Sequence, residues 1–306
     1  MDTNILLENG TNEVEILEFT LGNNHYGINV AKIKEILSYQ PVTPVPNSHP
    51  SVEGIFMPRD LMITVINLKS CIGIEDNGNE GLFIITNFNK LNIAFHVDSV
   101  IGINRVSWAD IIIPDETINC AGAGVSTGII KIKDKLIVIL DFEKIVSDIS
   151  PETGLKLSDI DDYKSDGNQK KRSDSPVLIA EDSPLLRKLI TDCLKQAGYT
   201  HLIVTPNGQE AWNIINQHKD QGDLYQSIHC IITDIEMPLM DGHRLTKLCK
   251  DDEEIKKIPL IIFSSLVNDE MRRKGEQLGA DAQLTKPEIG ELVDAIDKLI
   301  AKNTEF

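Results

Sequence analysis

The sequence is short of positive charge. Its 306 residues carry 47 acidic side chains against 30 lysines and arginines, which gives a net charge of −17. Nucleic acids and anionic membranes are bound chiefly by lysine and arginine side chains that contact phosphate groups. The balance therefore argues against a nucleic-acid-binding or membrane-surface protein, although it leaves room for a local basic patch.

Paired cysteines and long apolar runs are also missing, and a signal peptide is not expected. The five cysteines are odd in number and form no C-x-x-C pair, which favours reduced, buried thiols over disulfides or a zinc site. No apolar run approaches the ~18 residues that a membrane span needs. Residues 1–4 lack the basic and apolar regions of a signal peptide. We expect a cytoplasmic protein.

The chain is long enough for two domains, and its composition changes near residue 150. Before that point, short β-rich segments alternate with turns, which is typical of a barrel or sandwich. The apolar spacing within residues 30–37 predicts a helix. The expected hairpins and strands are residues 15–28, 52–57, 61–67, 87–90 and 133–135.

The apolar pattern stops between residues 151 and 174. Aspartates, glycine, asparagine and glutamine crowd this stretch, which is typical of a flexible linker. Its basic run, residues 170–172, could be a nucleic-acid patch, but the acids just upstream favour a solvated tether. We therefore predict domains at residues 12–150 and 175–303, joined by a linker at 151–174.

After residue 175 strands and helices alternate, and four apolar runs each end at polar side chains. The runs are residues 177–180, 231–233, 259–263 and 282–285. The polar residues that follow them are Glu181, Asp182, Asp234, Ser264 and Lys286. Such alternation predicts a parallel α/β sheet, and ligands of open parallel sheets sit beyond the carboxyl ends of the strands. These side chains are therefore expected to meet at one edge of the sheet.

The residue types at this edge fit phosphoryl chemistry. The Asp234 carboxylate can attack a phosphoryl group and hold it as an acyl phosphate. Glu181 and Asp182 can hold a divalent cation such as Mg²⁺ beside it, which relieves the repulsion among three acids. Lys286 can neutralise a phosphoryl oxygen, and Ser264 can donate a hydrogen bond to the attached phosphate. The alternative, that strand-end acids merely cap helices, accounts for single residues but not for the whole set.

Residues 175–303 resemble a response-regulator receiver domain. The matching stretches are LIAEDS at 178–183, DIEMPLMDG at 234–242, FSS at 263–265 and TKP at 285–287. The resemblance implies a flavodoxin-like (βα)5 fold in which Asp234 is the phosphoacceptor, Ser264 the switch hydroxyl and Lys286 the phosphate-binding lysine. It also implies that four residues bind Mg²⁺: Glu181, Asp182, Asp234 and, through its backbone carbonyl, Glu236.

Two residues depart from the receiver pattern. Gln283 stands three residues before the lysine, where many receivers carry an aromatic switch residue, so the rotamer-flip part of the switch is in doubt. Glu236 brings an extra carboxylate, and we expect it to tune the lifetime of the phosphate. A haloacid-dehalogenase-type phosphatase uses similar residues. Its nucleophile comes first and its acid pair last, whereas here the acid pair comes first.

The first domain shows no catalytic constellation. The glycine-rich stretch 120–124 lacks the G-K-[ST] of a phosphate loop and is expected to be a mobile turn. His25, His49 and His96 show no metal-ligand spacing and no neighbouring acid cluster in the sequence. Binding rather than catalysis is therefore expected of this domain.

Residues 12–150 resemble the CheW family of chemotaxis coupling proteins. The matching stretches are FTLG at 19–22, YGINV at 26–30, KEI at 34–36, PVPN at 44–47, VEGI at 52–55, Arg59, and VINL at 65–68. The resemblance implies an all-β fold of two interlocked β-barrels, with one face for the histidine kinase CheA and another for the cytoplasmic tip of the receptor. Arg59 matches an arginine of the coupling surface, although it could simply cap the turn at 58–60. Asp60 stands where many relatives have glycine.

A CheW-like domain followed by a receiver is the arrangement of the CheV family. The resemblance implies a chemotaxis adaptor that couples chemoreceptors to CheA, is recruited to membrane-associated receptor arrays and is regulated by phosphorylation on Asp234. It is then no enzyme beyond promoting its own Mg²⁺-dependent phosphorylation and dephosphorylation. As one alternative, the receiver could act mainly as a phosphate sink for CheA, localised by the first domain. A transcriptional regulator is disfavoured by the deficit of basic side chains and the absence of a basic aromatic platform.

Overall fold

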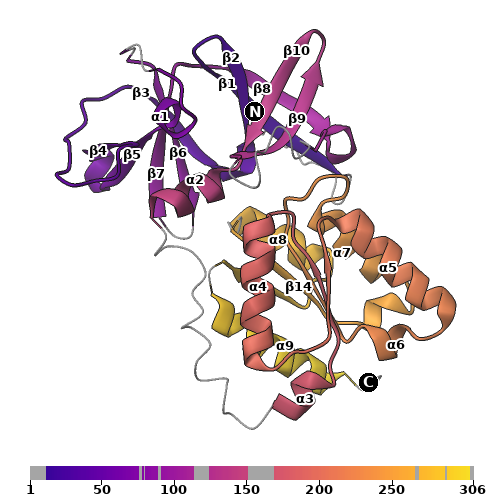
Figure 1. The fold of residues 1–306 in the computed structure, drawn as a ribbon. Coiled ribbons are helices and arrows are strands. Elements are labelled where there is room, and N and C mark those ends of the chain that lie inside the picture. Colours follow the sequence, from indigo (N-terminus) through magenta and orange to yellow (C-terminus); the bar gives the residue numbers. More distant parts are fainter. Residues whose placement is uncertain are drawn as a thin grey trace. The chain divides into compact units, whose positions relative to one another are not determined.

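The structure, a computed structural model, describes residues 12–75, 78, 80–88, 91–113, 124–150, 169–265, 269–286 and 288–303. The described residues divide into two compact units (Figure 1): residues 14–150 form the first, and residues 169–303 together with residues 12–13 form the second. Three expected features fall outside the described residues: the glycine-rich stretch 120–123, the turn at 89–90, and the linker from 151 to 168. Among the described helices, none combines the length and hydropathy that crossing a bilayer requires.

The first unit contains two five-stranded sheets within its described residues, which confirms the expected all-β domain. In sheet order, the strands of one sheet are β8 (Ser99–Ser107), β1 (Glu13–Leu21), β2 (Asn24–Asn29), β10 (Lys135–Leu140) and β9 (Ser126–Ile132). Those of the other are β3 (Ile33–Ser38), β6 (Leu82–Phe88), β7 (Leu91–Val97), β5 (Ile63–Asn67) and β4 (Val52–Phe56). The short helices are η1 (Val30–Lys32), η2 (Pro58–Asp60), α1 (Leu68–Cys71), η3 (Trp108–Asp110) and α2 (Phe142–Ile149).

The expected hairpins are present in this unit. Strands β1 and β2 pair antiparallel, with Gly22 in the left-handed region at φ 61°, which glycine adopts without steric cost. The helix expected over residues 30–37 is wrong beyond its first turn. After η1 the chain continues as β3, which pairs antiparallel with β6 so that Ile36 lies opposite Ile84. Side chains along β3 alternate between half-buried and exposed, which is the period of a strand.

Both sheets of the first unit share one hydrophobic cluster. Phe19 from β1 and Phe95 from β7 are buried together, and Phe142 at the start of α2 packs on both rings. The Phe95 and Phe142 centroids lie 4.7 Å apart, edge to face, a favourable aromatic geometry. Strand β10 also pairs parallel with β2, so the beginning and the end of this unit lie side by side. The two sheets are therefore interlocked by both pairing and packing.

The second unit is the expected parallel α/β domain. Its sheet order is β12 (Leu202–Thr205), β11 (Val177–Ala180), β13 (Cys230–Thr233), β14 (Leu260–Ser264) and β15 (Ala282–Thr285), all paired parallel. The helices are α3 (Gln169–Ser173), α4 (Pro184–Ala197), α5 (Gly208–Gln221), α6 (Leu224–Ser227), α7 (Gly242–Asp251), η7 (Ile255–Lys257), α8 (Asp269–Gln277) and α9 (Ile289–Lys302). Helices α4 and α9 cover one face of the sheet, and α5 and α7 cover the other (Figure 1).

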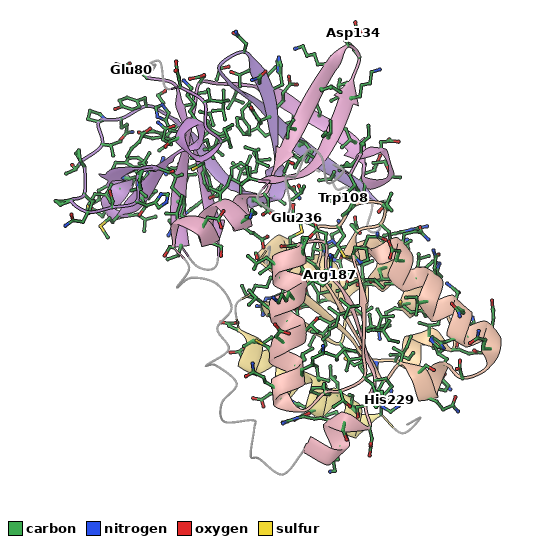
Figure 2. The ribbon with its side chains drawn as sticks, viewed as in Figure 1. Glu80, Trp108, Asp134, Arg187, His229 and Glu236 are labelled. Atoms are coloured by element: carbon green, nitrogen blue, oxygen red, sulfur yellow. The ribbon has the colours of Figure 1, made fainter. Side chains whose placement is uncertain are left out.

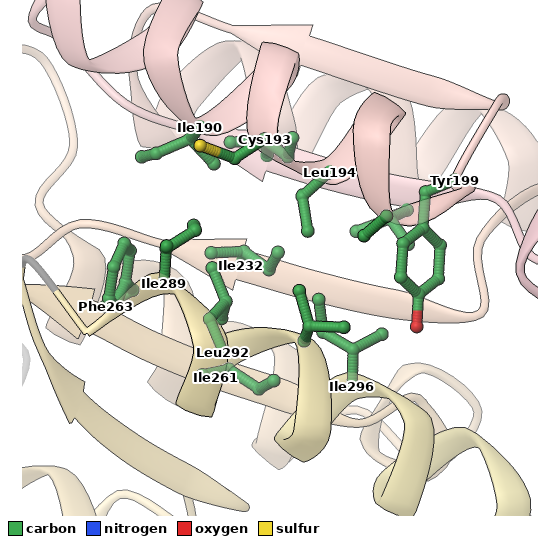
Figure 3. Close-up of a cluster of buried hydrophobic side chains, with 14 of the residues drawn as sticks. Ile190, Cys193, Leu194, Tyr199, Ile232, Ile261, Phe263, Ile289, Leu292 and Ile296 are labelled. Atoms are coloured by element: carbon green, nitrogen blue, oxygen red, sulfur yellow. The ribbon is translucent and has the colours of Figure 1, made fainter. Parts of the chain in front are cut away.

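The core of the second unit explains how the site is held rigid. The central strands β11, β13 and β14 are buried along their whole length, as expected for parallel strands covered on both faces. Apolar side chains of α4 and α9 pack on those of β13 and β14. Leu194 of α4, Leu292 of α9 and Ile232 of β13 all belong to this cluster (Figure 3). Helix α4 begins at the cap that Ser183 provides and ends at Gly198, which adopts φ 111°.

The carboxyl end of the expected linker differs from expectation. Residues 169–173 form the helix α3, and Arg172 is only 2% exposed rather than solvated. The expectation of a solvated tether is therefore wrong for Arg172. Composition alone suggested solvation, whereas a distant acid on α9, Asp297, compensates the buried charge.

Candidate functional site

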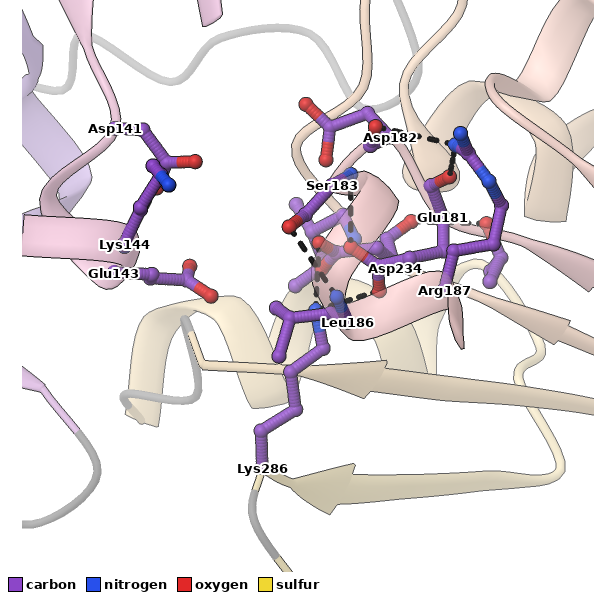
Figure 4. Close-up of polar contacts among 12 residues, drawn as sticks. Asp141, Glu143, Lys144, Glu181, Asp182, Ser183, Leu186, Arg187, Asp234 and Lys286 are labelled. Atoms are coloured by element: carbon purple, nitrogen blue, oxygen red, sulfur yellow. Dashed lines mark hydrogen bonds and ion pairs between the residues drawn. The ribbon is translucent and has the colours of Figure 1, made fainter. Parts of the chain in front are cut away.

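The polar residues singled out in the sequence follow the carboxyl ends of three neighbouring central strands and one edge strand. Glu181 comes directly after β11, Asp234 after β13 and Lys286 after β15, while Ser264 is the last residue of β14. The parallel register aligns these ends, since Ala180 lies opposite Thr233. Glu181, Asp182, Asp234 and Lys286 consequently gather at one edge of the sheet (Figure 4).

A buried ammonium group joins two of the acids. The Lys286 Nζ donates to Glu181 Oε2 at 2.7 Å and to Asp234 Oδ2 at 2.9 Å. The exposed fractions of these side chains are 2% for Lys286, 2% for Glu181 and 5% for Asp234. Buried charges persist only when paired and hydrogen-bonded, because desolvation otherwise outweighs the attraction. The ammonium group and the two carboxylates therefore hold one another in place.

The acids form a cluster with the chemistry of a divalent-cation site. One carboxylate oxygen from each of Glu181, Asp182 and Asp234 lies within 4.8 Å of the others. Three carboxylates this close repel one another, and Lys286 contacts only two of them in the hydrogen bonds described above. Hard oxygen donors with surplus negative charge are what Mg²⁺ selects. The residues present therefore fit that ion.

The backbone around Asp234 is shaped by a close approach of α7. The Asp234 Oδ1 accepts from the Ile235 amide at 2.6 Å, and the Gly242 amide donates to the Ile235 carbonyl at 2.9 Å. A Cβ at position 242 would lie 1.8 Å from the Asp234 carbonyl oxygen, so only glycine fits there. The DIEMPLMDG stretch thus needs its final glycine to bring α7 against the strand that ends at Asp234.

The other predicted residues lie near this edge of the sheet. Ser264 is buried, and its carbonyl accepts from the Lys286 amide at 3.2 Å. Glu236 is half-buried on the loop that follows Asp234, at the same end of the sheet as Arg187 (Figure 2). The roles assigned to Ser264 and to the Glu236 carbonyl stay predictions.

Sequence reasoning missed Arg187. Its Nη1 donates to the Glu181 carbonyl at 2.7 Å and to the Asp182 carbonyl at 3.2 Å, so it fixes the backbone that carries both acids. Arg187 lies in the first turn of α4, three residues after the Pro184 that opens the helix. The sequence does contain one indication, an arginine about one helical turn after the acid pair. An arginine at such a position is ordinarily interpreted as part of a solvent-exposed helix face.

Gln283, at the position of the usual aromatic switch residue, contacts α8 instead of carrying a ring. Its Nε2 donates to the Arg272 carbonyl at 2.7 Å. A Cβ on Gly275 would lie 2.4 Å from the Gln283 amide oxygen, so the two residues pack closely. The Gln283 side chain is thus held against α8 by a hydrogen bond.

Two buried titratable groups flank the start of α7. Asp241 caps the helix by accepting from the Arg244 amide, and burial raises the pKa of its carboxyl to about 6. Burial, with a smaller effect of Lys274, lowers the pKa of His243 to about 3. Among the residues that the structure describes, none offers a hydrogen-bond partner to the buried His243 Nε2, so its ring is held neutral.

In the first unit, Arg59 lies on an exposed and conformationally unusual turn. Arg59 and Asp60 adopt φ values of 52° and 65°, and the Arg59 side chain is 82% exposed. Its guanidinium lies 3.7 Å from Glu35 Oε2, an arrangement that contributes little at such exposure. Arg59 is therefore accessible to a partner, and its role in binding stays a prediction.

Two of the histidines of the first unit have acidic neighbours that the sequence order did not reveal. The His96 Nδ1 lies 2.7 Å from Glu53 Oε1, and the His25 Nδ1 lies 2.7 Å from Glu18 Oε1. Each carboxylate comes from a different strand than its histidine. Among the described residues, neither histidine belongs to a cluster of three metal-ligating groups.

Comparisons with known proteins match each half of the chain to a domain family. The family model described as CheW-like domain matches residues 15–150, and that described as response regulator receiver domain matches residues 177–297. The chemotaxis protein CheV3 of Helicobacter pylori is 30% identical over 309 residues, covering 95% of this chain and 96% of the relative. The chemotaxis protein CheV2 of the same organism is 28% identical with the same coverage. The crystal structure of the scaffolding protein TtCheW from Thermoanaerobacter tengcongensis aligns at 26% identity and a TM-score of 0.38, covering 42% of this chain and 88% of that one.

Proposed function

Because this chain belongs to the CheV family of chemotaxis coupling proteins, we propose that it joins chemoreceptors to the histidine kinase CheA and that phosphorylation of Asp234 regulates this coupling. The CheV, CheW and receiver-domain families are generally signalling adaptors rather than enzymes. Family members couple receptors to CheA, which supports the kind of partner. The proposed location is therefore the receptor array.

The observation that carries the proposal is the contact of Lys286 Nζ with both Glu181 and Asp234. In phosphoryl transfer, the Asp234 Oδ2 attacks the phosphorus of a phosphohistidine. The P–N bond breaks, an acyl phosphate forms and the imidazole leaves with the electron pair. Lys286 lies within reach of the incoming phosphoryl oxygens because it already contacts the attacking oxygen. Arg187 keeps the acid pair in position through its backbone contacts.

Binding of Mg²⁺ is part of this proposal. Receiver domains generally bind Mg²⁺, and we assign its ligands to Glu181, Asp182, Asp234 and the Glu236 carbonyl. When bound, the ion neutralises charge on the transferred phosphoryl group.

Ser264 is proposed to donate its hydroxyl hydrogen bond to the attached phosphate. The Glu236 carboxylate is proposed to tune the lifetime of the acyl phosphate, so Glu236→Ala should change the rate of autodephosphorylation.

The first domain is proposed to supply docking rather than chemistry. Arg59 is exposed on the turn between β4 and β5, where a partner can reach it. We propose that it belongs to the surface that contacts CheA or the receptor tip. Replacement by alanine should then weaken recruitment to receptor–kinase complexes without changing phosphoryl transfer to Asp234.

The test is a transfer assay with radiolabelled, phosphorylated CheA. The full chain should take up the label in the presence of Mg²⁺, and peptide mapping should place it on Asp234. Asp234→Asn and chelation of the metal should each abolish uptake, whereas Asp251→Asn, which alters an exposed aspartate of α7, should not. Label on another residue, or equal labelling after chelation, would refute the proposal.

A second arm separates the adaptor from a phosphate sink. Kinase output is measured in a reconstituted receptor–CheA array with the full chain or with the receiver alone. An adaptor requires the CheW-like domain for its effect. If the free receiver lowers output as well as the full chain does, the sink accounts for the protein instead.

A further inference from the structure

Arg172, which precedes the residues matched by the receiver family model, is buried in the second unit. It lies on α3 and is 2% exposed. Its Nη2 donates to Asp297 Oδ2 at 2.6 Å, its Nε donates to both oxygens of the same carboxylate at 3.1 Å, and its Nη1 donates to the Ala197 carbonyl at 2.9 Å. Bidentate pairing of this kind is the strong form of an arginine–carboxylate contact. The end of the linker is therefore held by α9 and by the end of α4.

A third residue completes this arrangement. The Tyr199 hydroxyl donates to Asp297 Oδ1 at 2.6 Å, while its ring packs in the core cluster between α4 and α9 (Figure 3). Burial and the hydrogen bond to Asp297 raise the pKa of Tyr199, so the phenol keeps its proton and donates. Arg172, Tyr199 and Asp297, which we call the latch, thus share one carboxylate.

Polar contacts rather than apolar packing attach α3. The helix has five residues, QKKRS, and none of them is apolar. A helix of this length is not stable alone. Other hydrogen bonds of this segment are polar as well. The Lys171 carbonyl accepts from Ser175, and the Ser173 carbonyl accepts from Thr200 and His201. A hollow of about 710 Å³ borders the latch, lined also by Lys171, Asp294 and Lys298. The position of α3 therefore depends on the latch.

Helix α9 connects the latch to the acid cluster. Lys286, which contacts Asp234, precedes the first residue of α9 by three positions. Asp297 lies eight residues into the helix, about 12 Å along its axis at ~1.5 Å per residue. Ile289, Leu292, Val293 and Ile296 bury one side of α9 against the core, so the helix moves as one body. The latch lies at the opposite end of the sheet, where α4 ends at Ala197 (Figure 1).

We propose that the latch relays the state of Asp234 through α9 to the linker, and that phosphorylation loosens it. The inference rests on the proposed phosphorylation of Asp234. A phosphoryl group on Asp234 draws the Lys286 ammonium away from its present carboxylate partners and shifts the segment that leads into α9. The buried Arg172 guanidinium tolerates little displacement, because a partial separation from Asp297 leaves its charge desolvated and unpaired. The linker end is then released at the end of the domain far from the chemistry.

The experiment is hydrogen–deuterium exchange on the full chain, with Mg²⁺ and acetyl phosphate as the small phosphodonor. Intact mass reports phosphorylation, and a peptide covering residues 169–176 reports the latch. We expect the exchange rate of this peptide to rise roughly fivefold or more on phosphorylation. A roughly fivefold change is the lower end of the coupling usually found between two sites. Arg172→Gln should show fast exchange without the donor. Tyr199→Phe, which removes one hydrogen bond and no charge, should have an intermediate rate. Asp294→Asn, an exposed acid of the same helix, should behave as wild type.

The outcomes separate the two proposals. Stoichiometric phosphorylation with unchanged exchange at residues 169–176 overturns the relay and leaves the proposed function standing. A failure of the wild type to take up phosphate overturns the proposed function and the relay with it. Coupling is reciprocal, so Arg172→Gln or Tyr199→Phe must also shift the phosphorylation equilibrium in the direction of the acyl phosphate. An unshifted equilibrium in a folded Tyr199→Phe variant likewise counts against the relay.

Discussion

At the scale of single residues, the main feature of the site is Lys286. Its ammonium group supplies part of the positive charge that the acid cluster would otherwise receive from a metal ion. Lys286 contacts two of the three acids that would bind Mg²⁺. Its ammonium group therefore competes electrostatically with the ion. The same group is needed once a phosphoryl oxygen arrives. Affinity for the metal and competence for phosphoryl transfer should thus respond in opposite directions when this residue is changed.

Lys286→Met tests this opposition. We expect Mg²⁺ to bind roughly tenfold tighter, because removing a unit charge beside the cluster is worth on the order of 1.4 kcal/mol. Phosphoryl transfer from CheA should be lost. Isothermal titration with Mg²⁺ measures the first effect. Lys195→Met, which removes an exposed lysine at the other end of α4, is the matched control and should change neither quantity. Weaker Mg²⁺ binding in Lys286→Met would contradict this account.

His243 gives a second expectation at this scale, concerning pH. Its pKa in the folded protein is about 3, below the ordinary value of 6.5 expected for the unfolded chain. The unfolded state therefore binds a proton first, and the stability that His243 contributes is present above pH 6.5 and lost as pH falls toward 3. Between pH 7 and pH 5 the loss amounts to about 2 kcal/mol.

The measurement compares urea unfolding of the wild type with that of His243→Gln at both pH values. Trp212 on α5 reports the second unit when Trp108 is replaced by phenylalanine. The variant should be less sensitive to acid by about 2 kcal/mol, since it carries no titrating group there. Equal acid sensitivity in the two proteins would show that His243 is not held neutral by burial.

At the scale of elements, turn η2 departs from ordinary backbone geometry. Arg59 and Asp60 are consecutive residues in the left-handed region, which costs residues with a Cβ roughly 1 kcal/mol each. The turn is exposed and carries the arginine proposed to contact a partner. Its geometry presents that side chain to solvent, which supports the proposed binding role of Arg59.

Asp60→Gly should therefore stabilise the first unit, by about 0.5–1 kcal/mol after the entropy of the added glycine is subtracted. Chemical unfolding followed by Trp108 fluorescence in a Trp212→Phe background measures it. Asp134→Gly is the control: this turn residue between β9 and β10 is not among the described residues with positive φ, so glycine there should only destabilise. Destabilisation by Asp60→Gly would show that the turn is not strained.

Helices and strands were predicted well where the apolar residues followed a single spacing along the sequence. The apolar runs before Glu181 and Asp234 are strands, because fully buried parallel strands leave a continuous apolar signal. The run before Lys286 is also a strand, half-buried at the edge of the sheet. The expectation failed at residues 33–38, where Ile33, Ile36 and Leu37 fit helical spacing. Pairing with β6 overrode that local pattern. Arg172 was missed because its partners are a carbonyl and an acid of distant segments, which no local pattern reveals. Arg187 was missed because an arginine in the first turn of a helix is ordinarily interpreted as solvent-exposed, although its carbonyl partners lie close in the sequence.

At the scale of the whole molecule, each unit has a hydrophobic core of its own. The clusters around Phe142 draw only on residues before 150, and the cluster around Ile296 only on residues after 176. The two units should therefore unfold in separate transitions. The alternating α/β pattern and the short β-strands allowed this division to be expected from the sequence.

Paired core variants test that independence. Phe142→Ala should lower the unfolding free energy of the first unit by about 3–5 kcal/mol, and Ile296→Ala that of the second by about 2–5 kcal/mol. Each variant should leave the other transition unchanged. Trp108 and Trp212, observed in single-tryptophan backgrounds, report the two units separately. A Phe142→Ala variant that shifts the Trp212 transition equally would mean that the chain unfolds as one cooperative body.

The parallel pairing of β10 with β2 has a consequence for biosynthesis. The hairpin of β1 and β2 emerges from the ribosome early, but its partner strand ends only at Leu140. Until that strand is translated, β2 keeps an unpaired backbone edge, the kind of edge on which nascent chains aggregate. A polypeptide arrested before Leu140 therefore still carries this open edge, whereas one released just beyond α2 can already close its first sheet.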